Sequence, residues 1–457
     1  MALHRTDGVG EGVDPFTDIY ALPISDRTLP KFRIPEHRNP PRAVRTLIQD
    51  ELALEANAAQ NFATFCTTWV EPEVRELMDA CIGKNLMDRD AYPRTAEIES
   101  RCLRILADLW NAPEGGAAVG CSTTGSSEAA MLAGIAMKSR RRSSDRPTDR
   151  PNLVCGPVHV CWEKFARYFD VELRRVPLEP EATGLRPHQL RRHVDENTIG
   201  VVAILGVTFT GHYEPVAELS AELDAIQAET GIDVPLHVDA ASGGFIAPFL
   251  QPELVWDFRL PRVASINTSG HKYGMAPLSV GWVLWRSPEL LPEDLVFEID
   301  YLGGATPTFG LSFSRPAGEV VAQYYNLLRL GRQGYKAIHE TTAHSARFLA
   351  ARIAEMGPFR VLHDGHDALP AVAWTLDDPG SAGFSLYDLS ERLRLRGWQV
   401  PAYPLPPDRQ ETVTQRVLVR HGTSHDKVAM LADDVRAAVA HLGRRSRSAR
   451  TEPGFHH

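Results

Sequence analysis

The feature that most constrains the fold is an alternation, between about residues 97 and 315, of helical stretches with short apolar runs. Six runs are candidate strands: NLVC (152–155), VELRRV (171–176), GVVAIL (200–205), PLHVD (235–239), VASIN (263–267) and VGWVLW (280–285). Strands this apolar are covered on both faces, and strands that alternate with helices pair in parallel. The pattern predicts an α/β fold with a mostly parallel central sheet and a ligand site at the carboxyl ends of its strands.

The segments on either side of this alternation differ in character. Residues 1–60 are expected to form an N-terminal arm and helical segment, and residues 61–315 a large domain that begins with the irregular stretch NFATFCTTWVEP. Residues 316–445 are expected to form a connecting helix and a small α+β domain, followed by a tail at 446–457. The small domain shows two candidate strands, WQVPAY and RVLVR, and two helical stripes: Leu386, Leu389 and Leu393, and Val428, Leu431, Val435, Val439 and Leu442.

Composition and charge exclude several classes of protein. No run of about 18 apolar residues appears and the N-terminus lacks the pattern of a signal peptide, so a cytoplasmic chain without a membrane span is expected. The six cysteines show no CxxC spacing and are expected to be reduced thiols, with no metal site. A net charge of −9 disfavours a nucleic-acid partner.

The sharpest local signal is SINTSGHKYG (265–274), in which a strand gives way to small residues and then to His271 and Lys272. A lysine that binds an aldehyde cofactor must be held away from solvent by closely packed backbone, and the flanking small residues permit that approach. An isolated His-Lys pair would usually lie at the surface. Its setting here favours a cofactor lysine.

Two further segments extend this interpretation. HVDAASGGF (237–245) places Asp239 at the end of a predicted strand, where a carboxylate can pair with a protonated pyridine nitrogen. GCSTTGSSEAAM (120–131) places Gly125, Ser126 and Ser127 at the start of an amphipathic helix, a natural site for a phosphate dianion. A strand-end cap and an ordinary serine N-cap are the alternatives for each segment taken alone.

Together and in this order, the three segments resemble the group II pyridoxal-phosphate decarboxylases, and further segments narrow the resemblance to the glutamate decarboxylase family. These are NFATFCTTW, VCWEKFARYFDVELR, GVTFTGHYEP, TGIDVPLHVDAASGGFIAPF, WDFRLPRVASINTSGHKYGMAPL, LVFEIDYLGG and FSRPAG. The similarity covers roughly residues 40 to 445. It implies the aspartate aminotransferase type of fold, fold type I, with pyridoxal 5′-phosphate as cofactor.

The resemblance also implies a role for each matching residue. Lys272 would carry the cofactor as a Schiff base, and Asp239 would pair with its ring nitrogen. Contacts to the phosphate and ring are implied for Gly125, Ser126, Ser127, His159, Thr208, Ala241, His271 and, from a second subunit, Ser314. Contacts to the substrate are implied for Thr64, Phe65, Asn85 and Asp88 around the distal carboxylate and for Arg416 at the α-carboxylate. Phe65, like Ser314, is expected to act in the site of a neighbouring subunit.

The implied activity is that of a carboxy-lyase converting L-glutamate to 4-aminobutanoate and carbon dioxide, with one proton consumed and Lys272 or His271 assisting its delivery. His159 departs from the bacterial pattern, which has glutamine there, and matches the wider group II decarboxylases. An aromatic amino acid, histidine or aspartate therefore stays open as the substrate. Transamination or β-elimination on the same scaffold, or a protein that only binds, are the more distant alternatives.

The resemblance further implies a homodimer at least, with a hexamer as the larger alternative. No tryptophan-containing basic amphipathic helix follows residue 443, so calmodulin is not expected as a partner. His456 in the tail TEPGFHH resembles the tail histidine that closes the site of the bacterial acid-resistance enzyme near neutral pH. A regulatory role for His456 is therefore expected, with a disordered chain end as the alternative.

Overall fold

The computed structural model describes residues 32–113, 118–144, 149–299 and 306–451. The chain divides into two compact units, residues 1–57 and 58–457. The described part of the first unit holds helix α1 (Pro41–Leu52). The second unit holds every other helix and strand of the described residues.

The centre of the second unit is a seven-stranded sheet in the order β1-β7-β6-β5-β4-β2-β3. Within this order, the neighbouring strands β6, β5, β4, β2 and β3 pair in parallel, whereas β7 is antiparallel to both of its neighbours, β6 and β1. Their bounds are β1 (Val119–Thr123), β2 (Asn152–Cys155), β3 (Glu172–Arg175), β4 (Thr198–Ile204), β5 (Leu236–Asp239), β6 (Val263–Ser269) and β7 (Gly281–Trp285). All six predicted runs are therefore strands, and the sheet is mostly parallel as expected.

The sequence pattern missed β1, which pairs along the edge of the sheet with β7. Its residues VGCST are small and carry no strong apolar alternation. Small size is what the position requires, because a Cβ on Gly120 would collide with the carbonyl oxygen of Val283 on β7. The close approach of the two strands, rather than their hydrophobicity, explains the composition.

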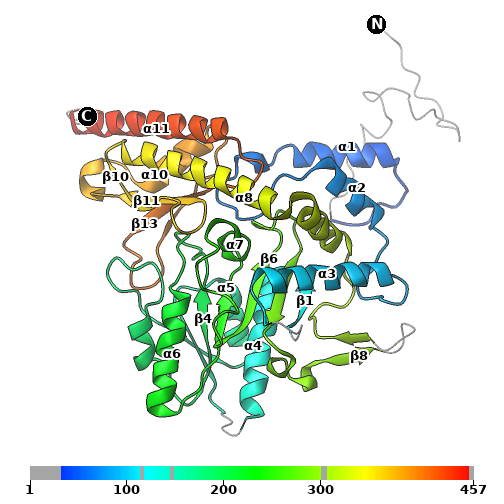
Figure 1. Ribbon diagram of the computed structural model, residues 1–457. Coiled ribbons are helices and arrows are strands. Elements are labelled where there is room, and N and C mark those ends of the chain that lie inside the picture. The colour runs from blue at the N-terminus through cyan, green and yellow to red at the C-terminus, as the bar shows by residue number, and fades with distance from the viewer. Residues whose placement is uncertain (1–31, 114–117, 145–148, 300–305, 452–457) are drawn as a thin grey trace, which may run out of the picture. The chain divides into compact units, whose positions relative to one another are not determined.

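Helices cover both faces of the sheet (Figure 1). Helices α3 (Pro93–Leu109) and α6 (Val216–Thr230) share one hydrophobic core with strand residues such as Val201. Helices α4 (Ser126–Arg142) and α5 (Val160–Tyr168) share another core with the next strand residue, Val202. Successive strand residues point to opposite faces, so two covered faces explain why whole strands are apolar. The large domain also holds α2 (Pro72–Ala80), α7 (Ala247–Leu250), β8 (Phe297–Ile299), β9 (Thr306–Thr308) and the short 3₁₀ segments Ala58–Gln60, Pro187–Arg192, Gly243–Phe245, Pro288–Leu290 and Glu293–Leu295.

The long helix α8 (Gly318–Ala354) leads into the small domain and bends at Gly331, which has non-helical backbone angles. The small domain is a four-stranded antiparallel sheet in the order β10-β11-β13-β12. It comprises β10 (Phe359–His363), β11 (Ala371–Leu376), β12 (Ala402–Pro404), β13 (Val413–Leu418), α9 (Pro379–Ala382), α10 (Leu386–Arg394) and α11 (His425–Thr451).

Both predicted leucine and valine stripes lie on helices, α10 and α11, and their buried members enter one core with Trp374 and Trp398. The candidate strand WQVPAY is shorter than expected, because only its end belongs to β12, and β10 and β11 were not predicted. All six cysteines are free thiols, as expected. Among the described residues no helix combines the length and the apolarity that crossing a membrane would need.

Candidate active site

Asp239 and Lys272 lie where two neighbouring strands of the central sheet reach their carboxyl ends. Strand β5 ends at Asp239, and β6 ends at Ser269, shortly before Lys272. Because the two strands are parallel partners, with Asp239 opposite Asn267, the carboxylate and the lysine loop lie side by side. Carboxyl ends of parallel strands are where α/β folds place their ligands.

A chain of buried hydrogen bonds holds the carboxylate of Asp239. Its Oδ2 accepts from Trp162 Nε1 at 2.9 Å, and its Oδ1 accepts from Asn267 Nδ2 at 3.1 Å. The other end of the Asn267 amide lies 2.7 Å from His237 Nε2, and His237 Nδ1 lies 2.7 Å from Ser265 Oγ. Burial lowers the pKa of His237 to about 4 against the opposing charge of Asp239, so the ring is neutral at ordinary pH. Nε2 then donates to the Asn267 oxygen, and Nδ1 accepts from the Ser265 hydroxyl.

The amine of Lys272 is enclosed by protein. Its Nζ lies 3.4 Å from Ser242 Oγ and 4.8 Å from the centre of the Phe65 ring. Burial lowers the pKa of Lys272, although the nearby Asp239 carboxylate acts in the opposite direction. A lowered pKa increases the fraction of free amine, which is the form that condenses with an aldehyde.

Thr67 fixes the backbone of the lysine loop. Its N–H donates to the His271 carbonyl oxygen at 2.7 Å, and its hydroxyl donates to the Lys272 carbonyl oxygen at 3.0 Å. The irregular segment after residue 61 is thus what covers the lysine.

The start of α4 meets this loop in a tight cradle. Ser269 Oγ donates to Ser126 Oγ at 2.7 Å. A Cβ on Gly125, whose φ is +150°, would lie 2.9 Å from Cε1 of His271, and His271 Nδ1 is buried without a hydrogen-bond partner among the described residues. Burial and the Lys272 charge lower the pKa of His271 to about 4. Ser127 lies at the same helix start.

Hydroxyls and free N–H groups at this positive helix end fit a phosphate, and an enclosed amine and a buried carboxylate lie beside it. This set of groups fits pyridoxal phosphate.

His159 lies beside the same site as the N-cap of α5. Its Nδ1 accepts from the Cys161 N–H at 3.3 Å. Partial burial and then the Lys272 charge lower the pKa of His159, with the Asp239 carboxylate opposing them. The imidazole is therefore close to both residues and favours its neutral form.

Ala241 and Thr208 occupy the turns beyond β5 and β4. The Ala241 N–H donates to Asp239 Oδ1 at 3.1 Å, and its carbonyl accepts from the Ser269 N–H. Thr208 lies in the turn that follows β4, which ends at Ile204. Gly206, with φ of +112°, turns the chain out of the sheet.

Arg416 enters the site from β13 of the small domain. Its guanidinium carbon lies 4.4 Å from the centre of the Phe65 ring, which is the ring that Lys272 also contacts. Arg416 Nη2 donates to the Ala63 carbonyl oxygen at 2.9 Å. Burial lowers the pKa of Arg416, and its Nε has no hydrogen-bond partner among the described residues. A buried guanidinium with an unused donor can receive a carboxylate.

Phe65 therefore contacts Lys272 and Arg416 of its own chain, which favours a place in that chain's own site over the expected place in a neighbouring subunit's site. Thr64 is adjacent, and its hydroxyl accepts from the Cys66 N–H at 3.1 Å. The segment reaches the site because it crosses both the lysine loop and β13.

Asn85, Asp88 and Ser314 form a separate group. Asn85 Nδ2 donates to Ser314 Oγ at 3.5 Å, and Asp88 Oδ1 accepts from the Ala91 N–H at 3.0 Å. No hydrogen bond or ion pair of the described residues joins these three side chains to Lys272 or Arg416. His456 lies outside the described residues.

Several residues of the site were not singled out from the sequence. Trp162 and Asn267 bind Asp239, and Ser242 contacts Lys272. Arg420 donates to the Cys66 carbonyl and, at 2.5 Å, to the Asn61 carbonyl, so it anchors the segment that bears Phe65. An asparagine in a strand expected to be covered on both faces was the available signal for Asn267, because a buried amide needs partners.

The fold and this site together indicate a pyridoxal-phosphate enzyme, and comparison with known proteins identifies its family. The pyridoxal-dependent decarboxylase conserved domain matches residues 35–377, and the chain belongs to this family. Its cofactor is therefore pyridoxal 5′-phosphate, as expected. Within the family, the chain is 52% identical to glutamate decarboxylase of Aliivibrio fischeri, covering 96% of this chain and 95% of the relative. It is 44% identical to glutamate decarboxylase beta of Listeria monocytogenes, covering 93% of each.

Solved structures agree with this placement. Glutamate decarboxylase of Lactobacillus brevis superposes with a TM-score of 0.90 at 43% identity, covering 93% of this chain and 98% of that one. Sphingosine-1-phosphate lyase of Burkholderia pseudomallei, at 24% identity and a TM-score of 0.78, shares the fold. The predicted α/β architecture of fold type I is confirmed.

Proposed function

We propose that this protein removes the α-carboxyl group of L-glutamate as carbon dioxide and releases 4-aminobutanoate, consuming one proton. The observation that carries the proposal is the match to glutamate decarboxylases over nearly the whole chain, which includes both domains that form the site. The Phe65 ring contacts both Lys272 and Arg416, and the charge of Asp239 acts on Lys272, so these groups give that chemistry a place.

The bound cofactor supplies a ring that takes up the electron pair left when carbon dioxide departs. Lys272 would hold the cofactor through its amine, and that amine, once free, would deliver a proton to the α carbon of the substrate. Asp239 would pair with the ring nitrogen, and the hydrogen bonds from Asn267 to Ser265 keep its carboxylate oriented. Ser126, Ser127 and His271 would bind the phosphate.

Arg416 would hold the α-carboxylate so that its bond to the α carbon stands perpendicular to the ring. Its position supports this role, because the guanidinium is buried against Phe65 and Tyr403 and has a donor to spare. Phe65, whose ring contacts both Arg416 and the Lys272 amine, would also keep water from between them. A dry site strengthens the charge interactions that orient the substrate.

The distal carboxylate would be bound by Thr64 and Phe65 together with Asn85 and Asp88. Since Asn85 bonds to Ser314, and no hydrogen bond or ion pair of the described residues joins Asn85, Asp88 or Ser314 to Lys272, we propose that these three act in the site of a partner subunit. Each site would then be completed by the partner, which makes at least a homodimer necessary for activity.

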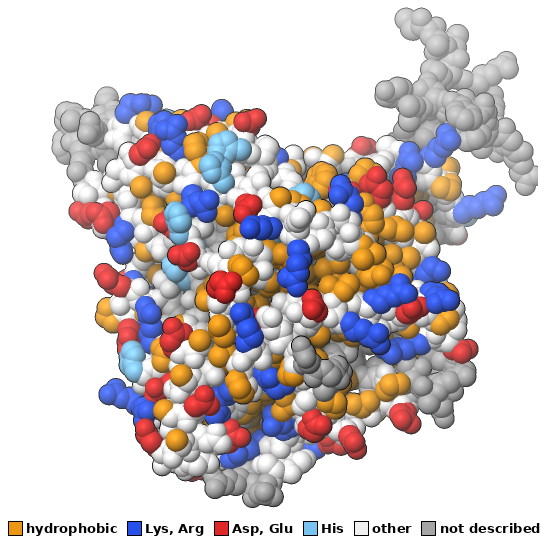
Figure 2. Space-filling view, in the orientation of Figure 1, with side chains coloured by type: hydrophobic (Ala, Val, Ile, Leu, Met, Phe, Trp, Pro, Cys, Tyr) orange, Lys and Arg blue, Asp and Glu red, His pale blue; other side chains and the backbone are white. Residues whose placement is uncertain are grey.

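The surface supports such an assembly. Figure 2 shows hydrophobic side chains gathered in a broad area to the right of centre. Among the exposed large hydrophobic residues, Leu278 follows the lysine loop, and Leu311 and Phe313 precede Ser314. Covering apolar residues of this kind is a common reason for association. We further propose that the assembly is a homodimer or a hexamer, that the protein is cytoplasmic, and that it acts without calmodulin.

A substrate panel tests the reaction. Purified holoenzyme is given glutamate, aspartate, histidine or an aromatic amino acid at several pH values, and carbon dioxide and the amine product are measured. Glutamate should be decarboxylated with the highest kcat/KM, and 4-aminobutanoate should match the carbon dioxide released. Faster turnover of another amino acid would show that the enzyme, which has His159 in place of glutamine, acts on a different substrate, and would overturn the proposal.

His456 would close the site near neutral pH as a neutral imidazole and release it when protonated. Removing residues 452–457 should then raise activity near neutral pH and leave the acidic limb of the pH profile unchanged. Identical profiles for full-length and truncated enzyme would remove the tail from the mechanism.

A further inference from the structure

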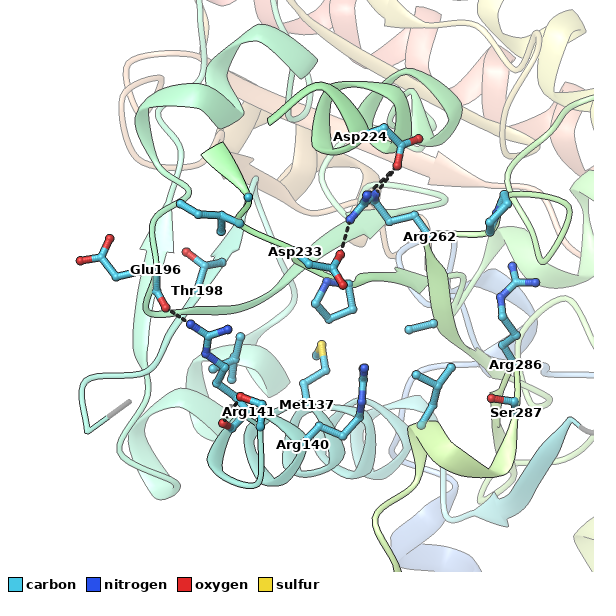
Figure 3. Close-up of a pocket in the computed structure, with 18 residues that line it drawn as sticks. Met137, Arg140, Arg141, Glu196, Thr198, Asp224, Asp233, Arg262, Arg286 and Ser287 are labelled. Carbon is cyan, nitrogen blue, oxygen red and sulfur yellow. Dashed lines mark hydrogen bonds and ion pairs between the residues drawn. The ribbon is translucent and has the colours of Figure 1, made fainter. Parts of the chain in front are cut away.

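A pocket of about 620 Å³, drawn in Figure 3, lies at the amino-terminal ends of the central strands, whereas Lys272 follows the carboxyl end of β6. The amino-terminal ends of β4, β5 and β6 contribute Thr198, Pro235 and Ala264, while the carboxyl ends of the same strands lead to the cofactor site. Helix α4 likewise begins at the phosphate cradle and ends here with Met137, Arg140 and Arg141. The pocket is therefore separate from the decarboxylation site.

Four arginines line this pocket, and three of them are held by protein groups. Arg262 pairs with Asp224 at 2.6 Å and with Asp233 at 2.9 Å. Arg141 donates to the Glu196 carbonyl oxygen, and Arg286 donates to carbonyl oxygens that include those of Val263 at 3.0 Å and Phe258 at 2.8 Å.

Carbonyl oxygens satisfy donors but carry no net charge. Only Arg262 among the four therefore has a carboxylate ion-pair partner within the described residues, and the pocket keeps an excess of positive charge.

Arg140 differs from the other three because its guanidinium has no hydrogen bond or ion pair in the part of the chain that the structure describes. Figure 3 shows its side chain extending from α4 into the pocket beside Met137. Burial lowers the pKa of Arg140, with the charge of Asp233 opposing it, but an arginine stays protonated in proteins. A partly buried cation without a partner is unfavourable, and a bound anion would relieve that cost.

We propose that this pocket binds a small organic carboxylate, with the carboxylate paired to Arg140 and an apolar body against Ile232, Pro235 and Leu290. The planar guanidinium fork matches a carboxylate, and the volume is within the range of small-molecule sites. The partly exposed apolar residues Ile232, Pro235 and Leu290 in the pocket wall favour an organic ligand over an inorganic anion, which would leave them uncovered.

Hexanoate is a suitable probe, because it combines one carboxylate with an apolar chain. Its binding to the holoenzyme is measured by calorimetry at constant ionic strength, with hexylammonium and inorganic phosphate as comparisons. Hexanoate should bind saturably with a dissociation constant in the millimolar range or lower, whereas hexylammonium should not bind and phosphate should bind more weakly.

Variants assign the binding to this pocket. Arg140→Gln should weaken hexanoate binding about tenfold or more, and Arg140→Lys should weaken it less because the charge remains. Arg142→Gln is the matched control: it makes the same change on the same helix, but Arg142 is exposed, pairs with Asp294 and does not line the pocket. It should bind hexanoate as the unmodified enzyme does.

Arg416 in the decarboxylation site can also receive a carboxylate, so the titration is repeated on Arg416→Gln. Binding that depends on Arg140 should persist in that variant. The proposal is overturned by an absence of saturable binding, by equal affinity of Arg140→Gln and unmodified enzyme, or by phosphate binding as tightly as hexanoate. Loss of all hexanoate binding in Arg416→Gln would equally overturn it.

Discussion

Asp239 is held from three sides, by the indole N–H of Trp162, the amide of Asn267 and the backbone N–H of Ala241. Three hydrogen bonds restrict the carboxylate to one orientation. The neutral His237 ring in turn fixes which way the Asn267 amide faces. If Asp239 pairs with the cofactor ring as proposed, Asn267 is a positioning residue that acts on the cofactor through Asp239.

Asn267→Ala should lower kcat about 10- to 100-fold, because a hydrogen bond to a charged group is worth about 1.5–3 kcal/mol. The visible absorbance of bound cofactor should persist, but its pH dependence should shift as Asp239 loses a donor. Ser265→Ala, at the far end of the chain of hydrogen bonds, should have a smaller effect on both. A normal kcat together with an unchanged absorbance profile in Asn267→Ala would show that Asp239 does not depend on the amide.

Helix starts and strand ends supply the groups of the cofactor site. Helix α4 begins directly after Gly125, whose backbone lies against Gly281 at the start of β7 and against the His271 ring. No side chain fits at Gly125, because its φ of +150° is unfavourable for other residues and a Cβ would meet His271. The phosphate cradle thus depends on a contact among one helix, one strand and one loop.

Gly125→Ala should displace His271 and weaken binding of pyridoxal phosphate about tenfold or more, while the thermal midpoint of the apoenzyme changes less. Gly83→Ala is a control, since a Cβ there meets no atom within 4 Å. The measurements are cofactor titration by absorbance and thermal unfolding without cofactor. Unaltered cofactor affinity in Gly125→Ala would argue against a tight phosphate cradle at this turn.

At the scale of the whole molecule, the site joins the large and small domains of one chain, with Lys272 and Phe65 together, and we place Ser314 in the partner's site. Mixed dimers distinguish these two arrangements. Inactive Lys272→Ala and Ser314→Trp chains, mixed and reassembled, should recover activity because one of the two sites then has both native residues. Lys272→Ala mixed with Phe65→Ala should recover none, because each site keeps one lesion.

The readout is decarboxylation by hetero-oligomers whose formation is verified with two affinity tags. Equal recovery in both mixtures would mean that Phe65 does act across the interface. Recovery in neither, with hetero-oligomers present, would place Ser314 outside the partner's site.

Buried histidines give the whole molecule a pH-dependent stability. Burial lowers the pKa of His212 and of His237 to about 4 and that of His339, on α8, to about 3. Because the unfolded chain takes up these protons first, near pH 6.5, the free energy of unfolding should fall as the pH drops from about 6.5 toward 4.

His339→Met should make that fall shallower, by up to about 1.4 kcal/mol per pH unit, because one buried base is removed. His366→Met changes a histidine whose side chain is 60% exposed and serves as the control. Urea unfolding of both variants and of the unmodified protein at pH 7, 6, 5 and 4 gives the comparison. Parallel stability curves for His339→Met and the unmodified protein would exclude His339 as a source of the acid sensitivity.

The sequence by itself determined the elements whose pattern is local. The six apolar runs became strands because both sheet faces are covered, and the leucine and valine stripes became α10 and α11 because one face of each meets a core. Lys272 and Asp239 could be placed at one edge because parallel neighbouring strands end there. Resemblance to known decarboxylases supplied the roles.

Only the tertiary structure decided which chain positions meet. Thr67 binds the backbone of Lys272 across 205 residues, and Arg416 reaches Ala63 across 353, so the lysine is covered by a segment with no periodic pattern of its own. The assignment of Phe65 to its own chain, the missed strand β1 and the arginine pocket have the same origin. Each depends on close approach between distant segments, and such contacts are set by packing rather than by the local alternation of residues.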